Sequence, residues 1–205
     1  MPSCINCGGE TKYNGGLCSK CYGEKNTESG KKTSEKNENH ASGLTKKERD
    51  FRYNMIKGRI AETLIQELFL SMGYNVFRYG MENTIPGIMD LLKGIRTDVA
   101  DDIRRMPDFV IQNPSTREVN FVEVKFRANE FFSLKDLSPN YPYTNSYFII
   151  VSKKHIKCIS YKELEEGMDI SPTSRNYLGS RKEFDLEKEV IIDFCSFAVQ
   201  FFESV

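Results

Sequence analysis

Three side chains in the middle of the chain have the types and the spacing needed to hold a divalent cation and a water molecule. Asp108 lies at the start of one short apolar segment, and Glu123 and Lys125 lie two residues apart in the next one. Two neighbouring carboxylates repel each other, and a divalent cation relieves this repulsion while acting as a Lewis acid. A lysine beside them can hold or polarise a water molecule. These residues therefore predict a metal-dependent hydrolytic site.

Two strands must bring these side chains together. Residues 107–112 and 120–127 are short and rich in Val, Ile and Phe, and the turn-forming sequence Asn-Pro-Ser-Thr follows the first of them. The second segment alternates apolar and charged side chains, which puts Glu123, Arg127 and the lysine between them on one face of a strand. If the two strands pair antiparallel through the turn, Asp108 lies near Glu123.

A long helix is predicted before these strands, over residues 44–72. Thr45 begins a capping box at its start, and apolar residues recurring at every fourth position from Ile56 onward predict a buried stripe. Glu62 lies at the edge of this stripe, and Gly58, one turn earlier, removes a side chain from the surface beside it. The pattern favours Glu62 as a third acid of the site, with a solvated surface glutamate as the alternative.

The remainder of the chain after the central strands also alternates predicted strands and helices. Residues 146–152 form a nearly continuous apolar run, which is typical of a strand buried on both faces. In a following strand, His155 and Cys158 are predicted to be packing residues rather than metal ligands. The last helix has a broad apolar face that could cover the sheet or also carry a dimer contact. Further predicted elements are a strand at 74–79, helices at 86–92 and 97–105, a strand at 155–160, a short helix at 161–166 and the last helix at 185–204.

Four cysteines near the N-terminus have the spacing of a zinc site. Cys4 and Cys7 form one Cys-x-x-Cys pair, and Cys18 and Cys21 form a second pair after ten intervening residues. Four thiolates complete the tetrahedral coordination of a structural Zn²⁺. Residues 1–24 are too few to form a core of their own, so zinc would supply their folding energy. The segment resembles a zinc ribbon, and a redox dithiol pair or four free cysteines are the alternatives.

Composition divides the 205 residues into the ribbon at 1–24, a polar linker at 25–43 and an α/β domain at 44–205. The 29 basic and 29 acidic residues give no net charge, which does not indicate tight nonspecific binding to nucleic acid but leaves a local basic patch open. No apolar run is long enough to span a bilayer, and the N-terminus has no stretch typical of a signal peptide. We therefore expect a cytoplasmic protein with no membrane partner.

The order of these elements and motifs resembles the PD-(D/E)XK nuclease superfamily over residues 50–160. In this sequence the motif consists of Pro107-Asp108, fourteen intervening residues, and Glu123-Val124-Lys125. Glu62 is similar to the first-helix acid of archaeal Holliday-junction resolvases and related restriction-endonuclease-like proteins. The resemblance implies an α/β fold with a restriction-endonuclease-like core, in which helices flank a central mixed sheet.

The resemblance also implies a mechanism. Asp108, Glu123 and the carbonyl oxygen of Val124 would bind Mg²⁺ or Mn²⁺, which stabilises the reacting phosphate and lowers the pKa of a bound water. Lys125 would orient that water or neutralise developing charge. Glu62 would complete the metal site or help to position a second ion.

Together these features favour a metal-dependent endonuclease that acts on DNA rather than RNA. Arg127 is a candidate contact to the nucleic-acid phosphate, and a salt bridge with a neighbouring acid is the alternative for it. The alternative function is a non-catalytic module that binds nucleic acid or protein on a nuclease-like fold. The zinc ribbon is expected to recognise nucleic acid or a protein partner, and the last helix is a candidate surface for a homodimer.

Overall fold

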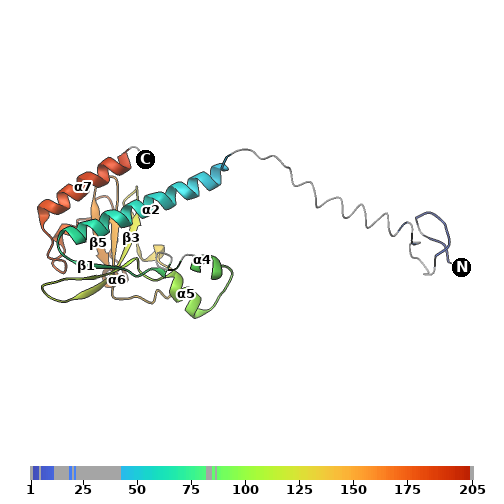
Figure 1. Cartoon of the computed structure of the whole chain (residues 1–205), viewed down its shortest axis with the longest axis horizontal. Coiled ribbons are helices and arrows are strands. Elements are labelled where there is room, and N and C mark those ends of the chain that lie inside the picture. Colours follow the sequence, from blue (N-terminus) through green and yellow to red (C-terminus); the bar gives the residue numbers. More distant parts are fainter. Residues whose placement is uncertain are drawn as a thin grey trace. The chain divides into compact units, whose positions relative to one another are not determined.

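The computed structural model describes residues 2–4, 6–11, 19, 21, 43–81, 85 and 87–203. The chain divides into two compact units, Met1–Thr45 and Lys46–Val205, and each is described by itself (Figure 1). Most of the predicted linker at 25–43 lies outside the described residues. The larger unit begins two residues after the predicted start of the α/β domain.

Helix α2 (Lys46–Ser71) is the long helix predicted before the central strands. Gly73 ends it with a φ of 77°, a left-handed conformation that glycine adopts without strain. The predicted apolar stripe is buried only in the second half of the helix, at Ala61, Leu64, Ile65, Leu68 and Phe69. Ile56 was expected in the core and is 53% exposed, because at about 100° per residue it lies on the opposite side of α2 from the fully buried Ile65.

A five-stranded mixed sheet forms the centre of the larger unit, with the strand order β1-β2-β3-β4-β5 (Figure 1). Neighbouring strands pair antiparallel, except that β3 and β4 pair parallel. The predicted antiparallel pairing of the two central strands is therefore confirmed. The strands are β1 (Asn75–Arg78), β2 (Phe109–Gln112), β3 (Val119–Phe126), β4 (Ser146–Val151) and β5 (Ile156–Ser160).

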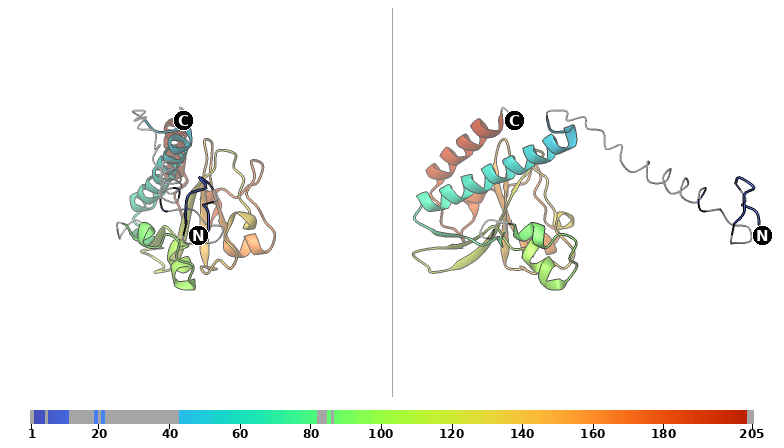
Figure 2. Two further views of the ribbon diagram at one scale, coloured as in Figure 1. Left: turned by 90° about the vertical axis from the view of Figure 1, so that its right-hand side faces the viewer. Right: turned by 45° about the vertical axis from the view of Figure 1, so that its right-hand side comes forward.

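Two hydrophobic cores cover the two faces of this sheet. The larger core packs α2 and the last helix, α7 (Lys188–Glu203), against one face, where Val122 and Val124 of β3 are buried. The smaller core contains Phe148 and Leu164 and lies on the other face, under α6 (Tyr161–Glu165). The left view of Figure 2 shows α2 and α7 on one side of the sheet and α6 on the other. The predicted α/β fold with helices flanking a mixed sheet is confirmed.

An insertion of two short helices separates β1 from β2. These helices are α4 (Ile88–Leu91) and α5 (Asp98–Arg104), close to the predicted positions. The side chain of Thr97 caps α5 by accepting a hydrogen bond from the backbone of Ala100. Arg105 donates a hydrogen bond of 3.1 Å to the carbonyl oxygen of Asn140, which links the insertion to the loop before β4.

Helix α7 buries Ile191, Ala198 and Phe202 against the sheet and leaves Phe197 and Phe201 exposed. The broad apolar face predicted for this helix is therefore only partly used inside the larger unit. Neither α7 nor any other helix in the described part of the chain is long and apolar enough to cross a membrane.

Candidate functional site

The register of β2 against β3 brings the two predicted carboxylates to adjacent strands. Phe109 pairs with Val122, so that Asp108, one residue earlier, continues the ladder beside Glu123. The carboxylate oxygen Oδ2 of Asp108 accepts a hydrogen bond of 2.7 Å from the backbone N–H of Val124. Only 6% of Asp108 is exposed. The site therefore has a rigid, buried acid at its centre.

Lys125 forms a hydrogen-bonded ion pair with Glu123 through its Nζ and the carboxylate oxygen Oε1. The Lys125 side chain is 35% exposed and the Glu123 side chain 13%, so this pair lines the wall of the site that solvent reaches. Both residues lie on the same face of β3, as the alternation predicted. The structure thus brings Asp108, Glu123 and Lys125 together.

Electrostatics at this site oppose the ionisation of Asp108. Burial, and next the negative charge of Glu123, raise its pKa well above the ordinary value, although Lys125 acts in the opposite direction. Burial would lower the pKa of Lys125, but Glu123 and Asp108 outweigh it and raise that pKa. The lysine therefore stays protonated at neutral pH, and both carboxylates interact with its positive charge.

Glu62 lies on α2. It is partly buried, and its negative charge also raises the pKa of Asp108, which places it within electrostatic range of the pair. A β-carbon added at Gly58 would meet no atom within 4 Å, so the surface one turn before Glu62 is open, as the sequence predicted. Glu62 as a third acid of the site stays a prediction.

Arg127 lies just beyond the end of β3 and is partly buried. Its Nη1 donates a hydrogen bond of 3.2 Å to the carbonyl oxygen of Phe126, and its backbone N–H donates to Val151. It takes part in none of the ion pairs found among the described residues. The salt bridge considered for Arg127 is therefore not formed there, and its positive charge lies near Lys125.

Tyr141 is a site residue that the sequence did not reveal. It is 8% exposed, and burial, followed by the charges of Glu123 and Asp108, raises the pKa of its hydroxyl. The hydroxyl lies beside that of Ser146, yet no hydrogen bond of good geometry joins the two buried groups. Tyr141 comes from the irregular segment before β4, so no local pattern connects it with the carboxylates.

Aromatic rings line the same face of the sheet beside the carboxylates. Tyr79 follows β1 and donates a backbone hydrogen bond of 2.9 Å to the carbonyl oxygen of Asp108. Its ring lies 5.3 Å from that of Phe121, which lies 5.4 Å from the ring of Tyr143. The ring of Tyr141 follows at 5.9 Å from Tyr143. These rings form a partly buried apolar wall next to the acids.

Three of the four predicted zinc ligands lie together in the smaller unit. The sulfur atoms of Cys4, Cys7 and Cys21 are all within 4.8 Å of one another and could hold a metal ion. Gly8 directly follows Cys7, has a φ of 74° and donates its N–H to the carbonyl oxygen of Cys4. Cys18 lies outside the described residues.

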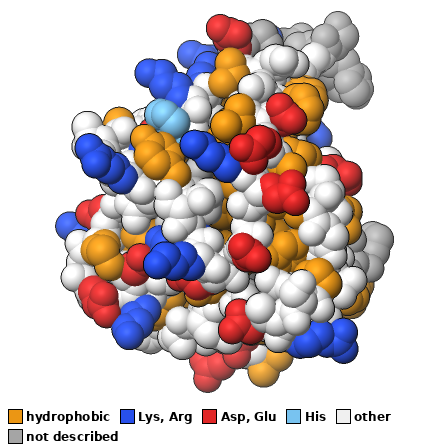
Figure 3. Space-filling model, turned by 90° about the vertical axis from the view of Figure 1, so that its left-hand side faces the viewer, with side chains coloured by type: hydrophobic (Ala, Val, Ile, Leu, Met, Phe, Trp, Pro, Cys, Tyr) orange, Lys and Arg blue, Asp and Glu red, His pale blue; other side chains and the backbone are white. Residues whose placement is uncertain are grey.

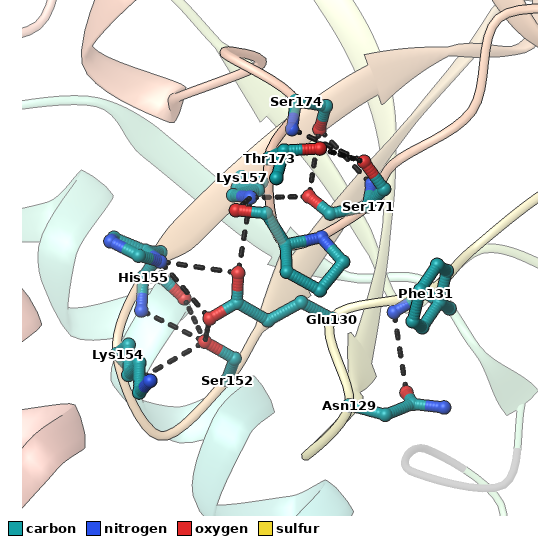
Figure 4. Close-up of polar contacts among 11 residues, drawn as sticks. Asn129, Glu130, Phe131, Ser152, Lys154, His155, Lys157, Ser171, Thr173 and Ser174 are labelled. Atoms are coloured by element: carbon teal, nitrogen blue, oxygen red, sulfur yellow. Dashed lines mark hydrogen bonds and ion pairs between the residues drawn. The ribbon is translucent and has the colours of Figure 1, made fainter.

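A second polar cluster, centred on Glu130, lies at the ends of β3, β4 and β5 (Figure 4). The ammonium group of Lys157, which is 1% exposed, lies 3.0 Å from Oε2 of Glu130. Oε1 of Glu130 accepts from Ser152 at 2.9 Å and lies 3.0 Å from Nδ1 of His155. Because the serine hydroxyl points to the glutamate and not to the imidazole, this is not a catalytic triad. The cluster joins three strand ends.

Comparisons of the chain with protein-family models, with curated proteins and with solved structures find no match. The class of protein is therefore described from its own fold and site alone. It is an α/β protein with a five-stranded mixed sheet, and it has a carboxylate–lysine site on one face and a cysteine cluster in a separate unit.

Proposed function

We propose that this chain is a metal-dependent nuclease of the restriction-endonuclease-like class that hydrolyses phosphodiester bonds, with DNA as the favoured substrate. The observation that carries the proposal is the juxtaposition of Asp108, Glu123 and Lys125 on adjacent strands. Two acids and a lysine at this spacing also form the motif of the PD-(D/E)XK superfamily, which the sequence resembles. A purely structural sheet has no need for such a group.

The donor atoms of the site fit a hard divalent cation. Asp108 and Glu123 supply carboxylate oxygens, the ligand type that Mg²⁺ and Mn²⁺ prefer. The N–H and C=O of one strand residue point to the same side of the strand. Because the Val124 N–H donates to Asp108, the Val124 carbonyl oxygen also points toward Asp108. A cation held by these three groups would favour the ionised form of Asp108, which burial and Glu123 disfavour. When bound, it would polarise a phosphate oxygen and lower the pKa of a water.

The remaining side chains of the site have complementary roles in this proposal. Lys125 orients the attacking water or neutralises charge on the phosphate, because its pKa is raised and it keeps its proton. Glu62 extends the acidic set from the helix side. Arg127 is a phosphate contact, and the buried hydroxyl of Tyr141 donates a hydrogen bond to a ligand at the carboxylates.

In the same proposal, Cys4, Cys7, Cys18 and Cys21 hold a structural Zn²⁺ in a ribbon that recognises nucleic acid or a protein partner. The support for it is the cluster of three cysteine sulfurs together with the position of the fourth in the sequence. A ribbon with four protein ligands leaves no open position on the metal, so its contribution is folding and recognition and not catalysis.

The test is a cleavage assay with purified full-length protein on circular, linear, branched and single-stranded DNA and on RNA, with Mg²⁺ or Mn²⁺. Wild-type protein should cleave at least one substrate, and Asp108→Asn and Lys125→Ala should each remove the activity. Matched controls are Asp90→Asn on α4 and Lys135→Ala before β4, which change exposed residues of the same types. Cleavage that survives both site variants would mean that the site is misassigned.

One observation favours a second candidate, a binding module without catalysis. The chain has no net charge, and Figure 3 shows acidic and basic side chains interspersed over the face that it presents, with no broad basic patch. Nucleic-acid-binding proteins ordinarily concentrate positive charge on one face. Binding of nucleic acid or protein without cleavage of any substrate, with either cation, would support this candidate.

A further inference from the structure

An apolar groove of about 600 Å³ lies between α2 and α7. Helix α2 contributes Ile56 and Ile60, and α7 contributes Phe194, Phe197 and Phe201. Several of these side chains are largely solvent-accessible, including Ile56 at 53% and Phe201 at 55%. Contiguous apolar surface of this kind is uncommon on proteins that act alone and marks an interaction surface.

Two charged residues on α2 border the groove, and their arrangement points to one occupant. Arg59 and Glu67 both line it, and each lies four residues from Thr63, which lines the groove between them. At 1.5 Å per residue they are about 12 Å apart along the helix. Neither takes part in any ion pair found among the described residues. The groove therefore presents one positive and one negative group at equal distances along α2 from Thr63.

This pattern is complementary to itself after a two-fold rotation. If two copies pack α2 against α2 in antiparallel orientation with the axis beside Thr63, Arg59 of each copy faces Glu67 of the other. The same operation brings Ile56 toward Leu70, since both lie seven residues from Thr63. Both are exposed, at 53% and 42%. An isologous contact thus pairs opposite charges and covers apolar side chains at once.

We propose that the groove between α2 and α7 is the interface of a homodimer, in which two antiparallel α2 helices cross at Thr63 and two Arg59–Glu67 ion pairs fix the register. The proposal is independent of the proposed nuclease function. Glu123 lies opposite Phe148, whose side chain packs on the α6 side of the sheet, so the interface leaves the carboxylate site open. One dimer therefore carries two accessible sites.

The experiment measures the molecular mass of the full-length protein by sedimentation equilibrium over a concentration series. Wild type should be a dimer, and Arg59→Glu and Glu67→Arg should each raise the dissociation constant at least about tenfold, because two like-charged pairs then face each other. An equimolar mixture of the two single variants should form heterodimers, since each charge then meets its opposite. The double variant Arg59→Glu/Glu67→Arg should dimerise like wild type.

Each of several results would overturn the proposal. These are a wild-type monomer at every concentration, single variants that dimerise as tightly as wild type, or single variants that dissociate but do not recover on mixing. Circular dichroism identifies a variant that has failed to fold, and in that case the mixing test is repeated with Arg59→Ala and Glu67→Ala. Each homodimer then lacks both ion pairs, whereas the heterodimer keeps one, so the mixture should dimerise more tightly than either variant alone. Arg52→Glu, on the exposed first turns of α2 outside the groove, is the matched control and should leave the mass unchanged.

Discussion

The carboxylate of Asp108 accepts a hydrogen bond of 2.7 Å from the backbone N–H of Val124. Through this side-chain bond, the hydrogen bonding between β2 and β3 continues one position beyond the pair of Phe109 and Val122. Because Glu123 and Lys125 flank Val124 in sequence and point to the face on which Asp108 lies, the bond fixes the spacing of all three groups. The pKa of Asp108 is nevertheless raised, since burial and Glu123 outweigh this bond.

Asp108→Asn will stabilise the cation-free protein at neutral pH and should remove the proposed nuclease activity. The asparagine carbonyl can still accept from Val124, but the buried negative charge beside Glu123 is gone. Because burial and Glu123 both oppose ionisation at this position, the free energy of unfolding should rise. Chemical denaturation in the presence of a chelator measures this, with Asp90→Asn as the control.

The pH dependence of this effect has a definite sign. A carboxyl whose pKa is higher in the folded than in the unfolded chain adds stability at low pH, and this contribution is lost as the pH rises through the folded value. The stability difference between wild type and Asp108→Asn should therefore grow with pH from about 4 toward neutrality. A difference that is constant over this range would contradict the raised pKa.

Cation affinity of the wild type should rise over the same range, because binding requires the ionised acid.

Tyr141→Phe will lower the rate of cleavage at saturating substrate by about tenfold to a hundredfold, the range expected for loss of one donor to the reacting group. The substitution removes only the buried hydroxyl near Glu123, so the thermal unfolding temperature and the KM should change little. Tyr161→Phe is the matched control, since its ring stacks on that of Tyr141 at 5.9 Å from the other side. Equal rates for the two variants and wild type would exclude a role for the Tyr141 hydroxyl.

Lys157→Met will destabilise the larger unit by about 3–5 kcal/mol, because it leaves Glu130 buried without its cation. Burial alone would raise the pKa of Glu130, but hydrogen bonds from Lys157, Ser152 and His155 lower it overall. A carboxyl with a lowered pKa stabilises the fold above its unfolded value, and this stability is lost as the pH falls through the folded value.

Two results together test the assignment of this cluster. Wild type should lose stability on acidification below about pH 4.5, and Glu130→Gln/Lys157→Met should be closer to wild type than Lys157→Met alone. A double variant as unstable as the single one would show that the buried charge is not the cause. Lys154→Met, at an exposed lysine of the same turn, is the control.

Local sequence patterns predicted the part of the site that depends on neighbouring residues. The alternation in β3 determined which side chains share a face with Glu123, and the turn before it predicted the antiparallel partner that carries Asp108. Period and register are local properties, so one sequence suffices for them. The edge position of Glu62 on α2 follows from helical periodicity in the same way.

The contacts that the sequence could not give join segments that are distant along the chain. Tyr141 and Glu130 belong to the irregular region between β3 and β4, where no period indicates which way a side chain points. Lys157 is 1% exposed because its partner, Glu130, comes from another segment. Ile56 has a different cause, because a four-residue repeat advances by about 40° per step around a helix and leaves Ile56 on the opposite side of α2 from the buried Ile65.

Removal of the predicted zinc should unfold the smaller unit and leave the larger one intact. In the described part of the smaller unit, the buried cysteines belong to the metal-binding cluster. The larger unit, by contrast, has two hydrophobic cores of its own. A strong chelator should therefore release one zinc per chain, measured with a chromogenic dye, without changing the thermal transition of residues 46–205. Cys21→Ser should abolish zinc binding in the same assay, and Cys195→Ser, a partly buried cysteine of α7, should not. Loss of the whole fold on chelation would show that the two units depend on one another for stability.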